Sequence, residues 1–260
     1  MAVVRARIAG GAHVSAAPAH GGAVPRFVAL GVAAVGTMAA TAMLLGMPTA
    51  SVAAGAGSLA AALVVCAVGM HRTHPHARLG AANVVTLVRL TIVGLLLSIL
   101  LAGGAHATAG HATTIVALGV VALCLDGVDG RLARRQGLAS RFGAAFDMEV
   151  DSAFALVLSV LAAFGPAGPL ALVLGLPRYV FGVAELLAPW LNAPLAPRFS
   201  RKAVCVVQLI ALIALQLPFL PPWAALTLVA LAAGLVAWSF GLDIARLSRS
   251  RQGLPATRAR

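Results

Sequence analysis

Long apolar stretches constrain the fold of this chain more than any other feature of its sequence. Eight of them reach the length of about 20 helical residues that crosses a hydrocarbon layer about 30 Å thick. They cover residues 27–47, 50–70, 83–104, 109–127, 144–164, 168–190, 203–220 and 223–243. Only 10% of the residues are charged, against about 25% in soluble domains. The sequence therefore predicts an all-α, polytopic integral membrane protein.

The basic residues alternate between the joints of these stretches. Of the 19 Lys and Arg residues, 17 lie in the two tails and in the second, fourth and sixth joints. The other joints hold none. Cytoplasmic loops carry an excess of Lys and Arg, so we expect a multi-pass protein of the cell membrane with both termini cytoplasmic. Anionic lipid head groups attract such basic segments, so the net charge of +12 requires no nucleic acid as a partner.

Arg89 and Arg178 are the two basic residues inside the apolar stretches. A charge at the bilayer centre costs about 2.5–3.5 kcal/mol on insertion scales. Arg89 lies near the cytoplasmic end of its stretch, so we interpret it as a snorkelling residue that reaches the interface. Arg178 lies deeper, and we expect it to face inward, toward a phosphate or toward Glu185 in an internal ion pair.

The acidic residues are few and clustered, because four of the five aspartates fall within 26 residues. Asp126 and Asp129 are three residues apart, and Asp147 and Asp151 are four apart, so each pair presents both carboxylates on one helix face. A loop that includes Gly137 would let the two helices fold back and bring the four carboxylates together at the cytoplasmic rim. Helix-end charges paired with nearby arginines would explain one such pair but not two. All-oxygen ligands suit Mg²⁺, Mn²⁺ or Ca²⁺ and not zinc, and we expect two divalent ions, Mg²⁺ or Mn²⁺.

The spacing of this segment is D-x2-D-G-x2-A-R-x8-G-x3-D-x3-D, from Asp126 to Asp151. It resembles the signature of the CDP-alcohol phosphotransferase (CDP-alcohol phosphatidyltransferase) family at all eight fixed positions. Upstream, Asn83, Thr86 and Arg89 resemble the N-x-x-T-x-x-R opening of that family's first core helix. The resemblance covers the C-terminal two thirds of the chain and implies a core of six transmembrane helices.

Two further apolar stretches precede this implied core. We accordingly divide the chain into a flexible cytoplasmic tail (1–26), an extra transmembrane hairpin (27–70), the core (71–247) and a basic C-terminal tail (248–260).

The resemblance implies a reaction and its residues. The family transfers a phosphoalcohol group from a CDP-linked donor, such as CDP-diacylglycerol, to an alcohol in phospholipid synthesis, and CMP is released. Carried over by position, Asp126, Asp129 and Asp147 bind the metal ions, and Asp151 completes the metal site and acts as general base. The implied donor-binding residues are Asn83, Thr86, Gly130, Ala133, Arg134, Ser140 and Gly143. The resemblance also implies a homodimer with a cytoplasmic active site.

The acceptor alcohol stays open at this stage. The family's acceptors include glycerol 3-phosphate, inositol phosphate, inositol and serine. Arg178, Arg201 and Lys202 would form a basic pocket for a phosphorylated acceptor, which favours glycerol 3-phosphate or inositol phosphate. Positive-inside charge is the simpler explanation for Arg201 and Lys202.

Two other interpretations concern the same polar residues. A membrane cation transporter could use the aspartates as an ion site, but transporters place such groups near the midplane on broken helices. Here the carboxylates adjoin cytoplasmic arginines at the ends of the stretches. His71, His74 and His76 alternate in a loop, and we expect a solvated linker there rather than a metal site.

Overall fold

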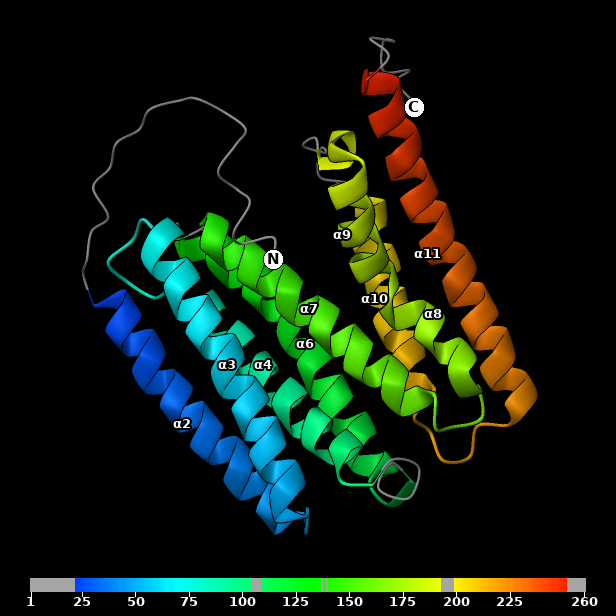
Figure 1. The fold of residues 1–260 in the computed structure, drawn as a ribbon, viewed down its shortest axis with the longest axis horizontal. Coiled ribbons are helices and arrows are strands. Elements are labelled where there is room, and N and C mark those ends of the chain that lie inside the picture. Colours follow the sequence, from blue (N-terminus) through cyan, green and yellow to red (C-terminus); the bar gives the residue numbers. More distant parts are fainter. Residues whose placement is uncertain (1–21, 104–108, 137, 139, 193–198, 252–260) are drawn as a thin grey trace. The chain divides into compact units, whose positions relative to one another are not determined.

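The computed structural model describes residues 22–103, 109–136, 138, 140–192 and 199–251, and for residues 128–136, 189, 192, 199 and 249–251 it describes the backbone only. The regular elements of this part of the chain are all helices (Figure 1). They belong to two compact units, one within Met1–Val157 and the other within Leu158–Arg260. The boundary between the units lies inside one continuous helix, α7 (Arg141–Ala162).

The first unit is built around α4 (Ala81–Leu101). Helices α2 (Ala23–Leu44) and α3 (Thr49–Thr73) form a hairpin, and α4 packs against both of them and against α6 (Ala112–Gln136). Gly46 in the hairpin turn has a φ of 75°, a left-handed conformation that costs glycine little because it has no Cβ. Most of the apolar part of α4 is buried, whereas α2 and α3 expose most of theirs. Helix α4 is therefore the central helix of this unit.

Helix α3 crosses α4 at very close range. An added Cβ at Gly55 would lie 2.0 Å from Ser98 Oγ and 3.1 Å from the Gly94 carbonyl oxygen. The Ser98 hydroxyl donates to the Gly94 carbonyl oxygen at 3.1 Å and lies 3.6 Å from the sulfur of Met38 on α2. Small residues let membrane helices approach in this way, so the hairpin is packed into α4 and does not merely lie beside it.

The second unit contains a helical hairpin and a broken segment. Its elements after α7 are η1 (Gly168–Ala171), α8 (Leu172–Gly175), α9 (Pro177–Leu187), η2 (Pro189–Asn192), α10 (Phe199–Ala214) and α11 (Pro222–Arg251). Helices α10 and α11 pack against each other, and α11 also contacts α8 and both 3₁₀ segments. The Gln216 amide donates to the carbonyl oxygens of Leu158 and Leu212, which ties the end of α10 to α7.

The predicted stretch 168–190 is not one straight helix. Gly168–Gly175 and Pro177–Leu187 meet at an angle of 53°. Pro177 has no N–H to continue the ladder and its ring clashes with the preceding turn, so α9 begins at this residue. Arg178 therefore lies in the first turn of a new helix, directly after the break.

The helices confirm the predicted class of protein. Four of them, α2, α3, α4 and the Pro222–Ser248 part of α11, are long and apolar enough to cross a membrane, or five elements if the bent pair counts as one span. The apolar part of α6, Ala112–Gly127, is shorter. Large apolar side chains on the hairpin, such as Val32, Leu44 and Val64, are exposed, as expected of a surface that lipid covers. The chain is thus an all-α polytopic membrane protein, and crossings by α6, α7 and α10 stay predictions.

Substitution of Gly55 tests the close crossing of α3 and α4. We expect Gly55→Ala to lower stability by about 1–3 kcal/mol, because the new methyl group overpacks against Ser98. Gly57, on the same helix, has nothing within 4 Å of an added Cβ, and Gly57→Ala should leave stability equal or raise it by up to about 1 kcal/mol. Thermal unfolding in detergent measures both. Adding Ser98→Ala to Gly55→Ala should restore part of the loss, and equal midpoints for the two alanine variants would contradict this crossing.

Candidate active site

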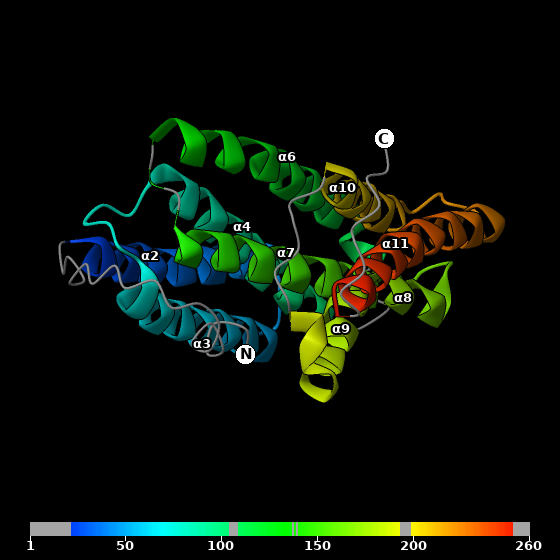
Figure 2. The ribbon, with the colours of Figure 1, turned by 90° about the horizontal axis from the view of Figure 1, so that it is seen from above.

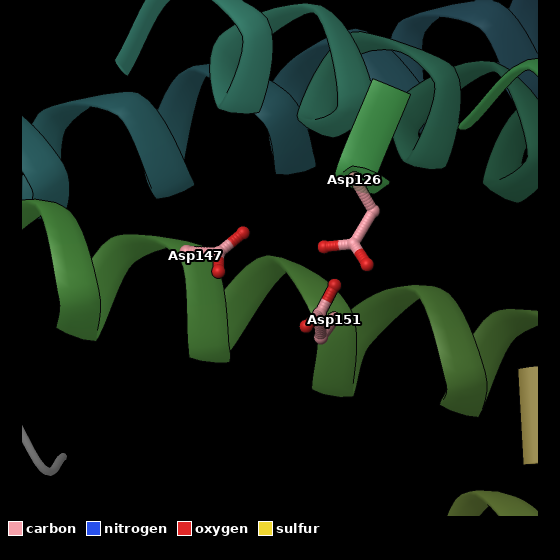
Figure 3. Close-up of side chains that lie close together, drawn as sticks. All are labelled: Asp126, Asp147 and Asp151. Atoms are coloured by element: carbon pink, nitrogen blue, oxygen red, sulfur yellow. The ribbon is translucent and has the colours of Figure 1, made fainter. Parts of the chain in front are cut away.

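Three of the four predicted metal ligands meet between α6 and α7. Asp126 lies on α6, and Asp147 and Asp151 lie one turn apart on α7, which runs in the opposite direction (Figures 1 and 2). Figure 3 shows the three carboxylates facing one another. One oxygen from each lies within 4.8 Å of the others, close enough to share a metal ion. The predicted same-face pair of Asp147 and Asp151 and the fold-back of the two helices both appear in this geometry.

Arg89 of α4 lies against the three carboxylates. Its Nη1 is 3.1 Å from Asp126 Oδ1 and 2.7 Å from Asp147 Oδ1, and its Nη2 donates to Asp151 Oδ1. The Arg89 side chain is 1% exposed. Its interpretation as a snorkelling residue is therefore wrong, because its charge is buried and paired inside the unit and is not exposed.

Arg89 is the site residue that the sequence reasoning missed. The available signal was its place as the last residue of the N-x-x-T-x-x-R pattern, in an apolar helix of a chain with a clustered set of carboxylates. A planar guanidinium offers five N–H donors in a fixed fork, which lets one side chain bond to carboxylates from two helices at once. A buried charge is tolerated only when it is paired in this way.

The cluster fits a divalent cation. Three ionised carboxylates and one guanidinium leave a net charge of −2 on the described side chains of the cluster, which a divalent ion balances. The donors are all carboxylate oxygens, which Mg²⁺ and Mn²⁺ prefer. The side chains of Asp147 and Asp151 are 39% and 36% exposed, whereas that of Asp126 is 11% exposed. The α7 side of the cluster is thus the side open to an ion or a substrate.

Asn83 and Thr86, two predicted donor-binding residues, lie on α4 in the turns before Arg89 and are buried. Asn83 Nδ2 donates to the carbonyl oxygen of Leu79, just before α4, and Thr86 Oγ1 donates to that of Ala82 within α4. An added Cβ at Gly143 would lie 3.0 Å from Asn83 Oδ1. Gly143 therefore allows α7 to approach α4 closely, two helical turns from Arg89 and one from Asp147.

Ser140 caps α7. Its Oγ accepts the backbone N–H of Gly143 at 3.0 Å, the usual bond from an N-cap residue to the third helical residue. Its Oγ is also 3.2 Å from Nδ1 of His74. His74 is 6% exposed and its ring contacts those of His76 and Phe142. The expectation of a solvated linker is therefore wrong for His74, whose burial depends on contacts with residues 66 positions later in the chain.

The remaining predicted residues fall into two groups. The side chains of Asp129, Gly130, Ala133 and Arg134 lie outside the described residues, although the backbone of α6 continues through them to Gln136. Arg178, Arg201 and Lys202 lie in the second unit, Arg178 half-buried on α9 and Lys202 exposed on α10.

Arg201 forms a fork with the fifth aspartate of the chain. Its Nε lies 3.0 Å from Asp243 Oδ2 and its Nη2 lies 3.2 Å from Asp243 Oδ1, so α10 and α11 are joined by a two-point ion pair. Asp243 is buried. The guanidinium of Arg201 is therefore held in place by its own unit.

A family model described as CDP-alcohol phosphatidyltransferase matches residues 79–241, which is more than half of the chain. The chain belongs to this family. Neither a curated protein nor a solved structure gives a match.

Members of the family are transferases of substituted phosphate groups, which move a phosphatidyl group from a CDP-alcohol to an alcohol in phospholipid synthesis and depend on a divalent metal. Family membership confirms the predicted family and class of reaction. The transporter interpretation finds no support, since the three described carboxylates lie on continuous helices.

Replacing Arg89 should make the stability of the protein depend on divalent cations. In Arg89→Gln the three carboxylates lose their internal cation, and breaking a buried ion pair in this way costs about 3–5 kcal/mol. We expect a large fall in the unfolding midpoint in excess chelator and a larger recovery on adding Mg²⁺ than the unsubstituted protein shows.

Arg201→Gln is the matched control, because it breaks an ion pair of α10 and α11 with a single described carboxylate. It should lose stability with no added response to Mg²⁺. An Arg89→Gln protein as stable in chelator as the unsubstituted one would contradict the role of Arg89.

Proposed function

We propose that this chain transfers the phosphatidyl group of a CDP-linked lipid such as CDP-diacylglycerol to the hydroxyl group of a small alcohol and releases CMP. The observation that carries the proposal is the gathering of Asp126, Asp147 and Asp151 around a buried arginine within the family-matched region. The reaction takes place on the cytoplasmic side of the cell membrane, where the basic joints and both termini also lie. The division into tail (1–26), hairpin (27–70), core (71–247) and tail (248–260) belongs to the same proposal.

The proposed metal ligands are Asp126, Asp129, Asp147 and Asp151, which would hold two ions of Mg²⁺ or Mn²⁺. Bound divalent ions would neutralise the charge of the transferred phosphate and of the departing CMP. Arg89 holds three of these carboxylates side by side despite their repulsion. Ligands that the protein itself holds together lose less freedom when they bind, which lowers the cost of binding.

Asp151 is the proposed general base. Arg89 donates to its Oδ1, so Oδ2 is the oxygen that takes the proton of the acceptor hydroxyl. The acceptor oxygen then forms its bond to phosphorus as the bond between that phosphorus and the CMP oxygen breaks. A carboxylate suffices as base because the transition state of phosphoryl transfer is loose and its nucleophile loses the proton late.

The proposed donor site joins α4 to the segment around α6 and α7. Its residues are Asn83, Thr86, Gly130, Ala133, Arg134, Ser140 and Gly143. The close approach of α4 and α7 at Asn83 and Gly143 supports a shared site on these two helices. Ser140 contributes through its cap, which fixes the first turn of α7.

The proposed acceptor is a phosphorylated alcohol, glycerol 3-phosphate or inositol phosphate, and its phosphate would bind Arg178, Arg201 and Lys202. The fork of Arg201 and Asp243 supports this role because it presents a restrained guanidinium, and restrained donors lose less entropy on binding. Incubating the purified protein with CDP-diacylglycerol and a panel of alcohols, then identifying the lipid formed, tests donor and acceptor together. We propose a homodimer as the assembly, which cross-linking in native membranes would test.

Asp151→Asn should abolish transfer in a folded protein. The amide keeps an oxygen that can accept from Arg89 but cannot act as a base, and loss of a general base costs about 10²–10⁴-fold in rate. Release of CMP is the measurement. Glu149→Gln, which removes a carboxylate from the same helix, is the matched control and should retain activity. Near-normal CMP release by Asp151→Asn would contradict the assignment of the base.

Removal of divalent cations should abolish activity completely, because the carboxylates would then keep their net negative charge and repel the phosphates of the donor. We expect Mg²⁺ or Mn²⁺ to restore CMP release after treatment with excess chelator. Full activity in the chelator would refute the metal site.

A further inference from the structure

The hairpin of α2 and α3 lies outside the family-matched residues 79–241, yet it contacts the helix that carries two of the carboxylates. Phe27 and His74 are among the side chains that make these contacts. His74, directly after α3, bonds to Ser140, and Phe27, in the first turns of α2, packs against Phe142 and Phe146 of α7. Both contacts fall on the first two turns of α7, immediately before Asp147.

The hydrogen bonds of His74 indicate which ring nitrogen carries the hydrogen in the neutral imidazole. Nε2 lies 3.0 Å from the carbonyl oxygen of Arg78, and because a carbonyl only accepts, Nε2 carries the hydrogen. In the neutral ring Nδ1 is then the acceptor, and the Ser140 hydroxyl donates to it. The same Ser140 oxygen accepts the Gly143 N–H. One continuous chain of bonds therefore runs from the α3–α4 loop through the imidazole and the serine hydroxyl to the backbone of α7.

The aromatic contacts restrain the first two turns of α7 from the other helix of the hairpin, α2. Phe27 is 0% exposed. Its ring meets those of Phe142 and Phe146 edge to face, with centroids 6.2 Å and 5.8 Å away, a geometry that stabilises aromatic pairs. Phe146 directly precedes Asp147 in the chain. The first two turns of α7 are thus held both at their cap and on their apolar face.

We propose that His74 is a positioning residue for the carboxylate site and that the extra hairpin is its support. By holding Ser140 as the cap, His74 fixes where α7 begins, and a helix is stiff enough to carry that position over about two turns to Asp147 and about three to Asp151. A shift of about 1 Å in such a site can cost about 10²-fold in rate. The inference depends on the proposed function only for its activity measurement, because binding of a cation to the carboxylates is measured separately.

A purely structural role for His74 makes a different prediction. If His74 only closes the α3–α4 loop, its bond to the Arg78 carbonyl oxygen is the important one. The two bonds can be separated because asparagine places its amide where Nδ1 lies and glutamine places its amide where Nε2 lies. His74→Asn keeps an acceptor for Ser140, whereas His74→Gln keeps a donor for Arg78 and loses the bond to Ser140.

The experiment compares His74→Asn, His74→Gln and His74→Ala in the full chain, purified in detergent. Mn²⁺ binding is followed by electron paramagnetic resonance, and the unfolding midpoint and the kcat and KM for CDP-diacylglycerol are recorded for each variant. We expect Mn²⁺ affinity to fall about tenfold in the Gln and Ala variants, as it does when outer partners of metal ligands are removed. The Asn variant should bind Mn²⁺ nearly as tightly as the unsubstituted protein.

His111→Ala is the matched control. His111 Nε2 lies 3.3 Å from the Leu45 carbonyl oxygen, at the opposite end of α2 from Phe27, so this variant loses a histidine bond to the hairpin at a different place from Phe27 and His74. It should leave Mn²⁺ affinity unchanged. If His74→Ala does not fold, the comparison of Asn with Gln decides the question.

Two outcomes would overturn the proposal. One is Mn²⁺ affinity that is equal in the Asn and Gln variants or higher in Gln, and the other is an affinity that stays at the unsubstituted value in all three variants. Failure of the proposed function has a different signature. The protein would then release no CMP from CDP-diacylglycerol in any form, while Asn and Gln could still separate in Mn²⁺ binding.

Discussion

The ion pairs between Arg89 and three carboxylates are the constraint on which the first unit depends. Lipid supplies little hydrophobic force to hold membrane helices together, whereas a buried charge without a partner is very costly. Helices α4, α6 and α7 must therefore meet where one guanidinium can reach all three carboxylates. The same pairing leaves negative charge in excess, so the interaction that stabilises the unit also prepares a place for a cation. The same side chains, Arg89 and the three aspartates, thus both stabilise the unit and prepare the cation site.

Local helix geometry explains why the carboxylates could be predicted from sequence. The spacing of Asp147 and Asp151 puts both on one face in any helix. The connection between α6 and α7 is short, and short connections make consecutive helices antiparallel neighbours. Arg89 could not be placed in this way, because two of its partners lie 58 and 62 residues further along the chain and its position near the end of an apolar stretch suggests snorkelling. The prediction that His74 is solvated was wrong for the same reason. The sequence of the polar loop does not show that Phe142, far along the chain, packs against the His74 ring. The break at Pro177 was visible in the sequence, but hydropathy alone does not register it.

The hairpin that precedes the family-matched region is part of the architecture of the first unit. Its two helices contact α4 at Met38 and Gly55, and its two cytoplasmic ends, by the proposed topology, contact α7 at Phe27 and His74. Helix α4 contacts both parts of the unit. Its Gly94 and Ser98 pack against the hairpin, and its Arg89 pairs with the carboxylates. A substitution in the hairpin can therefore change the position of the carboxylates in two ways, by displacing α4 or by displacing the start of α7.

The burial of Arg89 also has a consequence for biosynthesis. A chain emerges from the ribosome N-terminal end first, so α4 is made before Asp147 and Asp151. Until they are made, its arginine lacks these partners, and an unpaired arginine opposes insertion, by about 2.5–3.5 kcal/mol where it lies at the helix centre. Among the four spans α4 has the highest mean hydropathy, 2.5 against 2.0 to 2.1 for the others. The many leucine, isoleucine and valine residues of α4 favour insertion into the bilayer and so act against the cost of its arginine.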